Sequence, residues 1–356
     1  MDQPTFVEGF HDPEAVKKMT YHPLGNTGMQ VSRLSLGGGP IGGLYGSTSE
    51  AECVNMVHSA LKSGVNYIDT APWYGNGRSE EVLGKALKDV PRSAYYIGTK
   101  IGRYEPCVER MFDFSAERVA SSVDLSLKLL GLDYVDVIQV HDLEFAESLD
   151  LILNETLPAL QKVVEQGKAR HIGITGYPLS ILKQVVERSS VKIEVVLSYA
   201  RNTLIDDVLK EYMPSSDSSN YYPQSRNIGV ISACAVAMGL LCEGEPPEWH
   251  PAQQEIKDAS KLAAKFCKDA GSDLARLAVQ FSASTEGVAT HLMGSNDSRI
   301  FRRNLEAILS TPTAHEVELS QQVQEKFFQK LSKREWEGVS EVEYWEEMRK
   351  IQAGKR

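Results

Sequence analysis

Four residues of the sequence have the types needed for acid–base chemistry at an alcohol or a carbonyl group: Asp69, Tyr74, Lys100 and His141. A free tyrosine, with a pKa of about 10, is a poor proton donor or acceptor near neutral pH. A neighbouring ammonium lowers that pKa, and a carboxylate can hold the ammonium in place. An imidazole can then orient the substrate oxygen or relay its proton, while a nicotinamide supplies or takes the hydride.

Each of these residues also has a purely structural interpretation. An aspartate after a strand commonly caps the next helix, a loop tyrosine packs, a lysine is solvated, and a lone histidine is commonly a hydrogen-bonded core residue. Asp69, Lys100 and His141, however, each close a short apolar run, where a polar group is costly to bury without a partner. Their occurrence at the ends of three successive runs favours a catalytic set.

The runs that must position these residues are short and rich in β-branched side chains, and stretches of helical period separate them. The runs are continuously apolar, which is typical of strands buried on both faces. Eight strand–helix units predict an α/β fold, a (β/α)8 TIM barrel, in which catalytic groups gather at the C-terminal ends of the strands. Periodicity does not show closure, so an open doubly wound sheet stays the alternative. The predicted strands are Val31–Gly37, Val65–Asp69, Tyr95–Lys100, Val135–His141, Ala169–Thr175, Glu194–Ser198, Gly229–Cys234 and Val288–Met293.

Several signals mark the predicted helices. Ser49 and Glu52 form a capping box at the start of one helix, and Gly131 and Gly167 each stop another. The charged tail predicts a C-terminal helix over residues 336–356, with Ser340 as its cap.

The remaining segments extend the barrel unit. We expect residues 1–20 to be a loose extension, Tyr21–Ser32 to form a hairpin, and residues 21–335 to make one barrel domain. Three longer loops are predicted at residues 101–114, 214–226 and, up to near its end, 240–256.

Composition excludes several classes of protein. The chain has 356 residues and a net charge of −10, which argues against a nucleic-acid binder. No apolar run approaches the roughly 18 residues of a membrane span, and the N-terminus lacks the features of a signal peptide. The five cysteines are scattered without a CxxC pair, which argues against disulfides and a zinc ribbon. We therefore expect a cytoplasmic protein, a monomer or weak dimer, with a small-molecule substrate and no metal.

The ordered set Asp69, Tyr74, Lys100 and His141 resembles the catalytic tetrad of the aldo-keto reductases, over roughly residues 21–310. The resemblance implies a (β/α)8 barrel that uses NAD or NADP, with Tyr74 as general acid/base, Lys100 and Asp69 as the pair that lowers its pKa, and His141 orienting the substrate. Within the family the chain resembles the plant L-galactose dehydrogenase type, with which it shares Asp113–Arg118, Leu132–Asp136, His171–Gly176, Ala237–Leu241 and Pro247–Ala252.

The resemblance also implies a cofactor site, with departures from the family pattern. The glycine-rich run Gly37–Gly43 is not a Rossmann fingerprint, and we expect it to let the backbone approach the nicotinamide or substrate. Thr175-Gly176, Ser198 and Ala233 stand where the family commonly has a Ser-Asn pair, a glutamine and a stacking aromatic residue, so a reduced set of contacts is expected. The predicted cofactor-binding residues are Gly38, Asp69, Thr175, Gly176, Ser198, Ala233, Cys234, Val236, Met238, Ser295, Arg299 and Asn304.

The adenosine end of the site distinguishes NAD from NADP. Gly294 and Ile300 replace the lysine and arginine of the NADP pattern, and Asp297 would repel a 2′-phosphate. Arg299, with Arg302 and Arg303 nearby, keeps NADP as the alternative, but we expect NAD.

Aromatic residues are the candidates for the substrate side: Tyr45, Trp73, Tyr104 and Trp249, together with His141. Aromatic faces suit a sugar ring, a steroid or an aryl aldehyde. Three functions follow as hypotheses. The first is an NAD-dependent sugar dehydrogenase that oxidises an aldose such as L-galactose at its anomeric carbon. The others are an NADPH-dependent reductase of aldehydes, ketones or steroids, and a cofactor-binding regulatory subunit like the β subunits of potassium channels.

Overall fold

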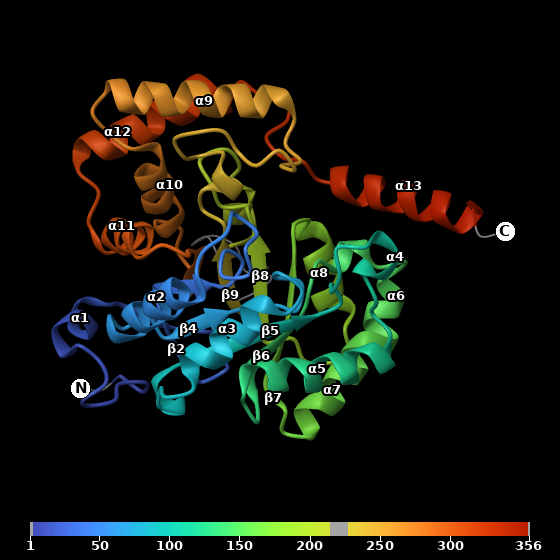
Figure 1. Ribbon diagram of the computed structural model, residues 1–356. Helices are drawn as coiled ribbons and strands as arrows, with labels where there is room; N and C mark the ends of the chain where they lie inside the picture. The colour runs from blue at the N-terminus through green and yellow to red at the C-terminus, as the bar shows by residue number, and fades with distance from the viewer. Residues whose placement is uncertain (1–2, 214–226, 355–356) are drawn as a thin grey trace.

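A parallel barrel forms the centre of the computed structural model, which describes residues 3–213 and 227–354. Within these residues eight strands close in the order β10-β3-β4-β5-β6-β7-β8-β9, with helices around the outside (Figure 1). The predicted barrel is confirmed, and the open sheet is excluded because β10 pairs with both β9 and β3. The barrel strands are β3 (Leu34–Gly37), β4 (Tyr67–Asp69), β5 (Tyr96–Ile101), β6 (Val135–Val140), β7 (Ala169–Gly176), β8 (Val195–Tyr199), β9 (Gly229–Ala233) and β10 (Thr290–Gly294).

The barrel strands are buried on both faces, which explains their continuous apolar sequence. On β8, Val195 and Leu197 belong to the cluster inside the barrel, whereas Val196 packs in the layer between strands and helices. Successive side chains point to opposite faces of a strand, so both faces need apolar residues here.

The helices begin and end largely where local signals place them. Ser49 and Glu52 form the predicted capping box of α2, and Gly131 ends α5 in the left-handed conformation, with φ of 66°. The helices are α1 (Pro13–Lys18), α2 (Glu50–Lys62), α3 (Arg78–Leu87), α4 (Val108–Met111), α5 (Ala116–Leu130), α6 (Leu149–Leu151), α7 (Leu157–Glu165), α8 (Leu179–Arg188), α9 (Gln254–Asp269), α10 (Leu274–Ala283), α11 (Ser298–Leu309), α12 (Ala314–Val323) and α13 (Val339–Gly354).

The N-terminal hairpin closes the end of the barrel at which the strands begin. Strands β1 (Tyr21–Pro23) and β2 (Gln30–Ser32) pair antiparallel as predicted, and Leu24 is buried among the residues inside the barrel. A Cβ on Gly25 would lie 2.3 Å from the amide nitrogen of Gly229, so only glycine allows this close approach to the start of β9.

The expectation of a loose segment before the hairpin is wrong. Residues 13–18 form α1, Asp12 caps it, and Val16 and Met19 are buried against the barrel's outer layer. The side chain of Asn66 donates a hydrogen bond of 3.0 Å to the Thr5 hydroxyl, which fixes the chain before the helix as well.

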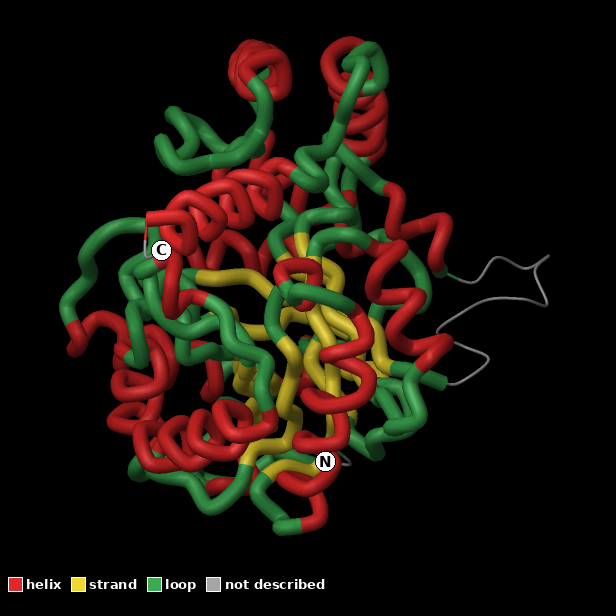
Figure 2. Tube along the Cα trace, turned by 90° about the vertical axis from the view of Figure 1, so that its right-hand side faces the viewer, coloured by secondary structure: helices red, strands yellow, loops and turns green. Residues whose placement is uncertain are grey.

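The C-terminal segment ends in a single helix, α13, whose Tyr344 packs against Phe112 and Phe145. Figure 1 shows α13 on the side of α4 and α6, separated from the α9–α12 group, and Figure 2 gives the barrel from a second side. The helix begins at Val339, so Ser340 lies inside its first turn and is not the cap that the sequence predicted. No helix in the described part of the chain is long and apolar enough to cross a bilayer.

The three predicted long loops agree with the structure to different degrees. Residues 101–114 contain the short helix α4 and a bridge between Arg103 and Phe112. Residues 240–256 are irregular until α9 begins at Gln254, as predicted. The loop expected at 214–226 lies outside the described residues.

Candidate active site

Three neighbouring strands bring the four acid–base residues to one end of the barrel. Asp69 ends β4, Lys100 lies near the end of β5, His141 follows β6, and Tyr74 lies in the loop after β4. Because β4 pairs with β5 and β5 with β6, all in parallel, their C-terminal ends are adjacent. This is the end at which barrels carry catalytic groups.

Lys100 lies at the centre of the set. Its Nζ donates to a carboxylate oxygen of Asp69, to the carbonyl oxygen of Thr70 at 2.8 Å and to the Tyr74 hydroxyl at 3.3 Å. The rings of Tyr74 and His141 meet edge to face with centroids 5.8 Å apart. The structure therefore places the ammonium against the phenol and the imidazole beside it.

Burial determines the protonation states of these groups. Burial raises the pKa of Tyr74 more than the Lys100 ammonium lowers it, so the lowered tyrosine pKa expected from the sequence is not found. Burial opposes the charge of Lys100, but Asp69 and Tyr74 raise the pKa of this lysine overall. Burial lowers the pKa of His141 to about 3, so its imidazole is neutral at physiological pH.

A glutamine completes the coordination of the buried carboxylate. Gln139 is fully buried on β6, and its Nε2 donates a 2.7 Å hydrogen bond to Asp69 Oδ2, opposite the oxygen that Lys100 contacts. Glycines on the two adjacent strands leave room for this side chain: a Cβ on Gly98 or Gly173 would lie 3.4 or 2.9 Å from it. Gln139 thus fixes the orientation of the carboxylate that holds Lys100.

The glycine-rich run after β3 packs against the tyrosine loop. A Cβ on Gly42 would lie 2.5 Å from the backbone carbon of Tyr74, and one on Gly38 would lie 2.5 Å from the Ser79 hydroxyl. The sequence suggested that these glycines admit a ligand. In the structure Gly38 and Gly42 make room for the protein's own side chains and backbone, and the contact of Gly42 positions Tyr74. The approach of this run to a nicotinamide or substrate stays a prediction.

A cavity of about 470 Å³ opens above the tetrad. Of the predicted substrate residues, Tyr45, Trp73, His141 and Trp249 line it. Tyr45 and Trp249 also contact each other, with ring centroids 5.8 Å apart. Tyr104 does not line the cavity: it is buried beneath the Arg118 guanidinium, which lies 4.2 Å from the centre of its ring.

Several lining residues were not predicted. Arg103 and Asp142 form an ion pair of 2.7 Å, and the Arg103 guanidinium lies 4.1 Å from the centre of the Trp73 ring. Glu144 enters from the turn after β6, and Glu341 from α13. Arg103, Asp142 and Glu144 follow strand ends as the tetrad does, so the same signal could have found them, whereas nothing in the sequence points to Glu341.

The predicted nicotinamide contacts divide into two groups. Asp69, Thr175, Ala233 and Met238 line the cavity. Ser198 does not, because on β8 its neighbours Leu197 and Tyr199 face the cavity and successive side chains alternate. Three further residues lie beside the cavity without lining it: Gly176, Cys234 and Val236.

The donor set and surfaces of this cavity fit a nicotinamide. Leu197, Ala233 and Tyr199 provide apolar and aromatic surface for a flat ring next to Tyr74. The Thr175 hydroxyl is the hydrogen-bonding group available there to a carboxamide.

The expected adenosine site lies at the start of α11. Asp297 is the N-cap, and its carboxylate binds Arg299 through both the backbone N–H at 2.6 Å and the guanidinium at 2.7 Å. Hydrogen bonding to Arg299 lowers the pKa of Asp297 to about 2. Ser295 is buried and donates to the Asp297 carbonyl oxygen at 2.8 Å, and Asn304 lies farther along the helix, partly exposed. Arg299 is therefore paired with Asp297 at the protein surface, where its side chain is 87% exposed.

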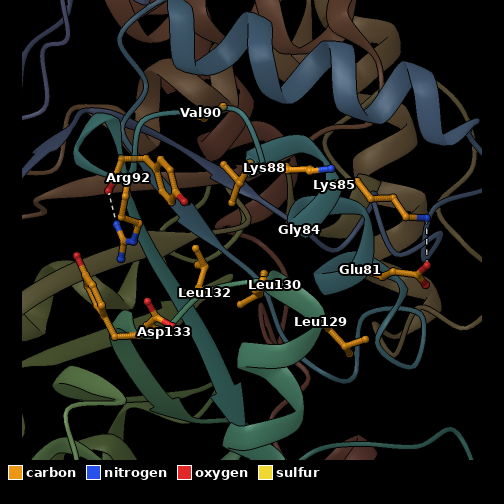
Figure 3. Close-up of a pocket in the computed structure, with 14 residues that line it drawn as sticks. Glu81, Gly84, Lys85, Lys88, Val90, Arg92, Leu129, Leu130, Leu132 and Asp133 are labelled. Atoms are coloured by element: carbon orange, nitrogen blue, oxygen red, sulfur yellow. Dashed lines mark hydrogen bonds and ion pairs between the residues drawn. The ribbon is translucent and has the colours of Figure 1, made fainter.

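A second cavity, of about 560 Å³, lies far from this chemistry (Figure 3). It is formed where α3 and α5 end and where the chain enters β5 and β6, at the N-terminal end of the strands. Figure 3 shows Lys85 bound to Glu81, and Arg92 bound within its own turn to the Tyr95 carbonyl oxygen at 2.9 Å. Glu81, Lys85 and Arg92 are thus used in structural contacts, and none of the four acid–base residues lines this cavity, so the smaller cavity is the candidate site.

A closed parallel barrel with a lysine, tyrosine, aspartate and histidine at its strand ends defines a (β/α)8-barrel oxidoreductase. The chain belongs to the aldo/keto reductase family, whose sequence profile matches residues 33–325. It is therefore an NAD(P)-dependent oxidoreductase enzyme.

Individual relatives agree with this assignment. The chain is 44% identical over 294 residues to L-galactose dehydrogenase of Arabidopsis thaliana, which covers 82% of this chain and 88% of the relative. It is 31% identical over 267 residues to D-arabinose 1-dehydrogenase of Saccharomyces cerevisiae, covering 71% and 76%. Among solved structures, an aldo-keto reductase from Bacillus halodurans in its holo form superposes with a TM-score of 0.69 at 28% identity, covering 86% of this chain and 96% of that one.

Proposed function

We propose that this enzyme oxidises the anomeric hydroxyl of an aldose such as L-galactose, with NAD as the oxidant. The observation that carries the proposal is the tetrad at the floor of a cavity whose walls combine aromatic rings with carboxyl groups. Such walls offer both the apolar faces and the hydrogen-bonding groups of a sugar site. The similarity to relatives named for aldose dehydrogenation supports the same reaction.

The side chains of the tetrad have distinct roles in this reaction. Tyr74 acts as the phenolate, which the Lys100 ammonium stabilises, and takes the proton of the anomeric hydroxyl to become the phenol. The neutral His141 donates a hydrogen bond to the same substrate oxygen and so orients it. Thr175, Leu197 and Tyr199 would hold a nicotinamide at this end of the barrel, and the chemistry it would supply there is hydride transfer in either direction. The products of the oxidation are a lactone, the reduced cofactor and a proton.

The choice of NAD is supported by the start of α11. Arg299, the cation that a 2′-phosphate would need, is bound to Asp297. An additional phosphate would meet the Asp297 carboxylate at this position, and like charges repel. Comparing kcat/KM with the two cofactors tests this choice, and a strong preference for NADP would contradict it.

A turnover panel tests the reaction itself. Purified enzyme is assayed with L-galactose, D-arabinose, aryl aldehydes and steroid ketones, with each cofactor, beside Tyr74→Phe. We expect aldose oxidation by the wild type and a loss of about 10²- to 10⁴-fold in Tyr74→Phe, because general acid–base catalysis contributes that much. NADH binding, followed by fluorescence, should be retained in the variant.

The other outcomes of this panel identify other functions. Reduction of aldehydes, ketones or steroids with NADPH, without aldose oxidation, would assign a carbonyl reductase. Negligible turnover together with a stoichiometric protein partner would assign a regulatory subunit.

The setting of the enzyme is part of the same proposal. It works in the cytoplasm as a monomer or weak dimer, with residues 21–335 as one barrel domain. Size-exclusion chromatography with light scattering tests the oligomeric state.

A further inference from the structure

The cavity above the tetrad has an excess of carboxyl groups. Two cations line it, Lys100 and Arg103, and each is bound to a carboxylate, Asp69 and Asp142 respectively. Two more carboxyl groups, those of Glu144 and Glu341, remain after these two pairs are formed.

Glu144 is held with one oxygen free. Its Oε1 accepts a hydrogen bond of 2.9 Å from the backbone N–H of Tyr177, which fixes the side chain against β7. Its Oε2 is buried and has no hydrogen-bond partner among the described residues. A Cβ at position 176 would lie 2.5 Å from this oxygen, so Gly176 provides the space in which it sits. A buried oxygen held in this way is costly to leave without a partner.

Glu341 reaches the same cavity from the other end of the sequence. It lies in the first turn of α13, whose Tyr344 packs edge to face against Phe112 and Phe145, with centroids 5.1 and 5.7 Å apart. These contacts dock α13 beside the turn that carries Glu144. Burial, together with the negative charge of Asp142, raises the pKa of Glu144, and burial also raises that of Glu341.

The histidine of the tetrad supplies a second buried group that lacks a partner. His141 is 6% exposed and lines the cavity, and its Nδ1 has no hydrogen-bond partner within residues 3–213 and 227–354. One polar atom of the tetrad and one of the wall thus lack a partner among the described residues, and both side chains belong to residues that line the cavity. The carboxyl groups are not arranged as a metal site, since no group of three or more His, Cys, Asp or Glu in the described residues could hold an ion.

We propose that Glu144 and Glu341 select the substrate: Glu144 binds a hydroxyl group of an uncharged sugar, and Glu341, together with Asp142, excludes sugars that carry a carboxylate or a phosphate. The inference rests on the proposed aldose oxidation. A hydroxyl donates to a carboxylate oxygen, and it can also accept from a protonated carboxyl group. An anionic sugar meets the carboxyl groups of Asp142 and Glu341 instead, and an apolar carbonyl compound leaves Glu144 Oε2 without a partner. Sites built to bind a hydroxyl reject analogues that lack it much more strongly than apolar pockets reject a small change in size.

The test compares one sugar with its charged counterpart. Initial rates are measured with L-galactose and with L-galacturonate, which carries a carboxylate at C6, for the wild type, Glu144→Gln and Glu341→Gln. The wild type should prefer L-galactose by at least about 100-fold in kcat/KM, since unpaired or opposed charges in a desolvated site are strongly disfavoured. Glu341→Gln should narrow that preference by about tenfold, the effect of removing one charge worth about 1.4 kcal/mol. Burial holds the pKa of Glu144 well above its usual range, so Glu144→Gln removes little charge and should leave this preference nearly unchanged. An unchanged ratio in Glu341→Gln would overturn the inference.

Two controls separate a specific effect from a general one. Glu346→Gln removes a charge from the exposed side of α13 and should leave the ratio as in the wild type. Thermal unfolding of each variant shows whether it is folded, and Glu341→Gln serves alone if Glu144→Gln does not fold.

A competition experiment separates this inference from the proposed function. Galactitol, an uncharged polyol, is added to the reduction of 4-nitrobenzaldehyde. If the wild type oxidises no aldose, the proposed function fails. Competitive inhibition by galactitol that is weakened in Glu144→Gln would then still support hydroxyl recognition, and the absence of such inhibition would overturn it.

Discussion

Burial shifts the pKa values of the catalytic side chains Tyr74 and His141, and the distances between the residues alone do not show these shifts. Lys100 donates a hydrogen bond to Tyr74, yet the pKa of Tyr74 is raised. Burial destabilises the phenolate more than the Lys100 ammonium stabilises it. The same burial keeps His141 neutral. The resting site therefore holds a phenol, an ammonium and a neutral imidazole.

These protonation states predict the pH dependence of the reaction. Oxidation needs the phenolate of Tyr74, whose pKa is raised, so its kcat/KM should rise with pH through the range 7–9. Reduction needs the phenol, which is already protonated, so its kcat/KM should stay flat over the same range. Because the pKa of His141 lies at about 3, neither profile should show an inflection near pH 6.5. Stopped-flow or steady-state profiles in both directions check this, and a histidine-like inflection would contradict it.

The hydrogen bond of Gln139 to Asp69 gives a second prediction for single residues. Gln139→Leu removes the donor to Asp69 Oδ2 and should lower kcat by about 10- to 100-fold, since hydrogen bonds to charged groups are worth roughly 1.5–3 kcal/mol. KM for the sugar should change little, because Gln139 does not line the cavity.

Two measurements distinguish positioning from structural damage in Gln139→Leu. Thermal unfolding should show a folded barrel, because leucine fills the site between Gly98 and Gly173. A variant with wild-type kcat, or with a loss confined to KM, would show that Gln139 does not position the carboxylate.

The sequence identifies some of these residues and not others, for physical reasons. Asp69, Lys100 and His141 each close an apolar run, so their place at the barrel mouth could be predicted. Gln139 lies within a strand and Glu341 lies 200 positions after His141, so no local pattern connects them with the site. Tyr104 was placed in the cavity wrongly because the chain turns at Gly102, with φ of 100°, and the tyrosine then packs under Arg118.

The length of a helix or strand determines whether its hydrophobic pattern can be recognised in the sequence. All eight barrel strands were predicted, because continuous apolar runs bounded by helices are a strong signal. Helices α1 and α4 have six and four residues, too few for a hydrophobic period, and both were missed. The start of α13 was misplaced because Ser340 and Glu343 match the pattern of a capping box. In the structure the helix begins at Val339, and both residues lie inside it.

The start of α11 carries a prediction about cofactor choice. Asp297→Asn keeps a side-chain oxygen for the N-cap but removes the charge that neutralises Arg299. The freed guanidinium and the positive end of the helix dipole should then favour a 2′-phosphate. We expect the NADP-to-NAD ratio of kcat/KM to rise by about tenfold, the effect of roughly 1.4 kcal/mol.

The control for this cofactor prediction lies on the same helix. Glu306→Gln removes an equal charge from an exposed position away from the N-terminus and should leave the ratio unchanged. A ratio that moves equally in both variants would show an effect of net charge rather than of the capped arginine.

The whole molecule depends on contacts between segments that are far apart in sequence. Closure of the barrel rests on β10 pairing with β3, and periodicity within each strand carries no information about that pairing. Docking of α13 is also a long-range contact. Tyr344 packs against Phe112, which follows β5, and Phe145, which follows β6, both about 200 or more positions earlier in the sequence. Both arrangements follow from where apolar surface remains to be covered after the strands have formed.

The docking of α13 gives a prediction at this scale. Tyr344→Ala removes the ring that anchors the helix, and loss of a buried aromatic side chain costs about 3–5 kcal/mol. The helix should then leave the barrel, and Glu341 should leave the cavity with it. KM for the aldose should rise by about tenfold or more, while the barrel unfolds at the same temperature, because α13 contributes nothing to strand pairing.

Hydrogen exchange measures the docking directly. Backbone amides of residues 339–354 should lose protection in Tyr344→Ala, while amides of the barrel strands keep it. Val342→Ala is the matched control, since Val342 is 56% exposed on the same helix and its loss should change neither exchange nor KM. If the exchange of α13 rises and KM stays constant, the helix is dispensable for substrate binding, and selection of the sugar then belongs to Glu144 and the residues that follow the strand ends.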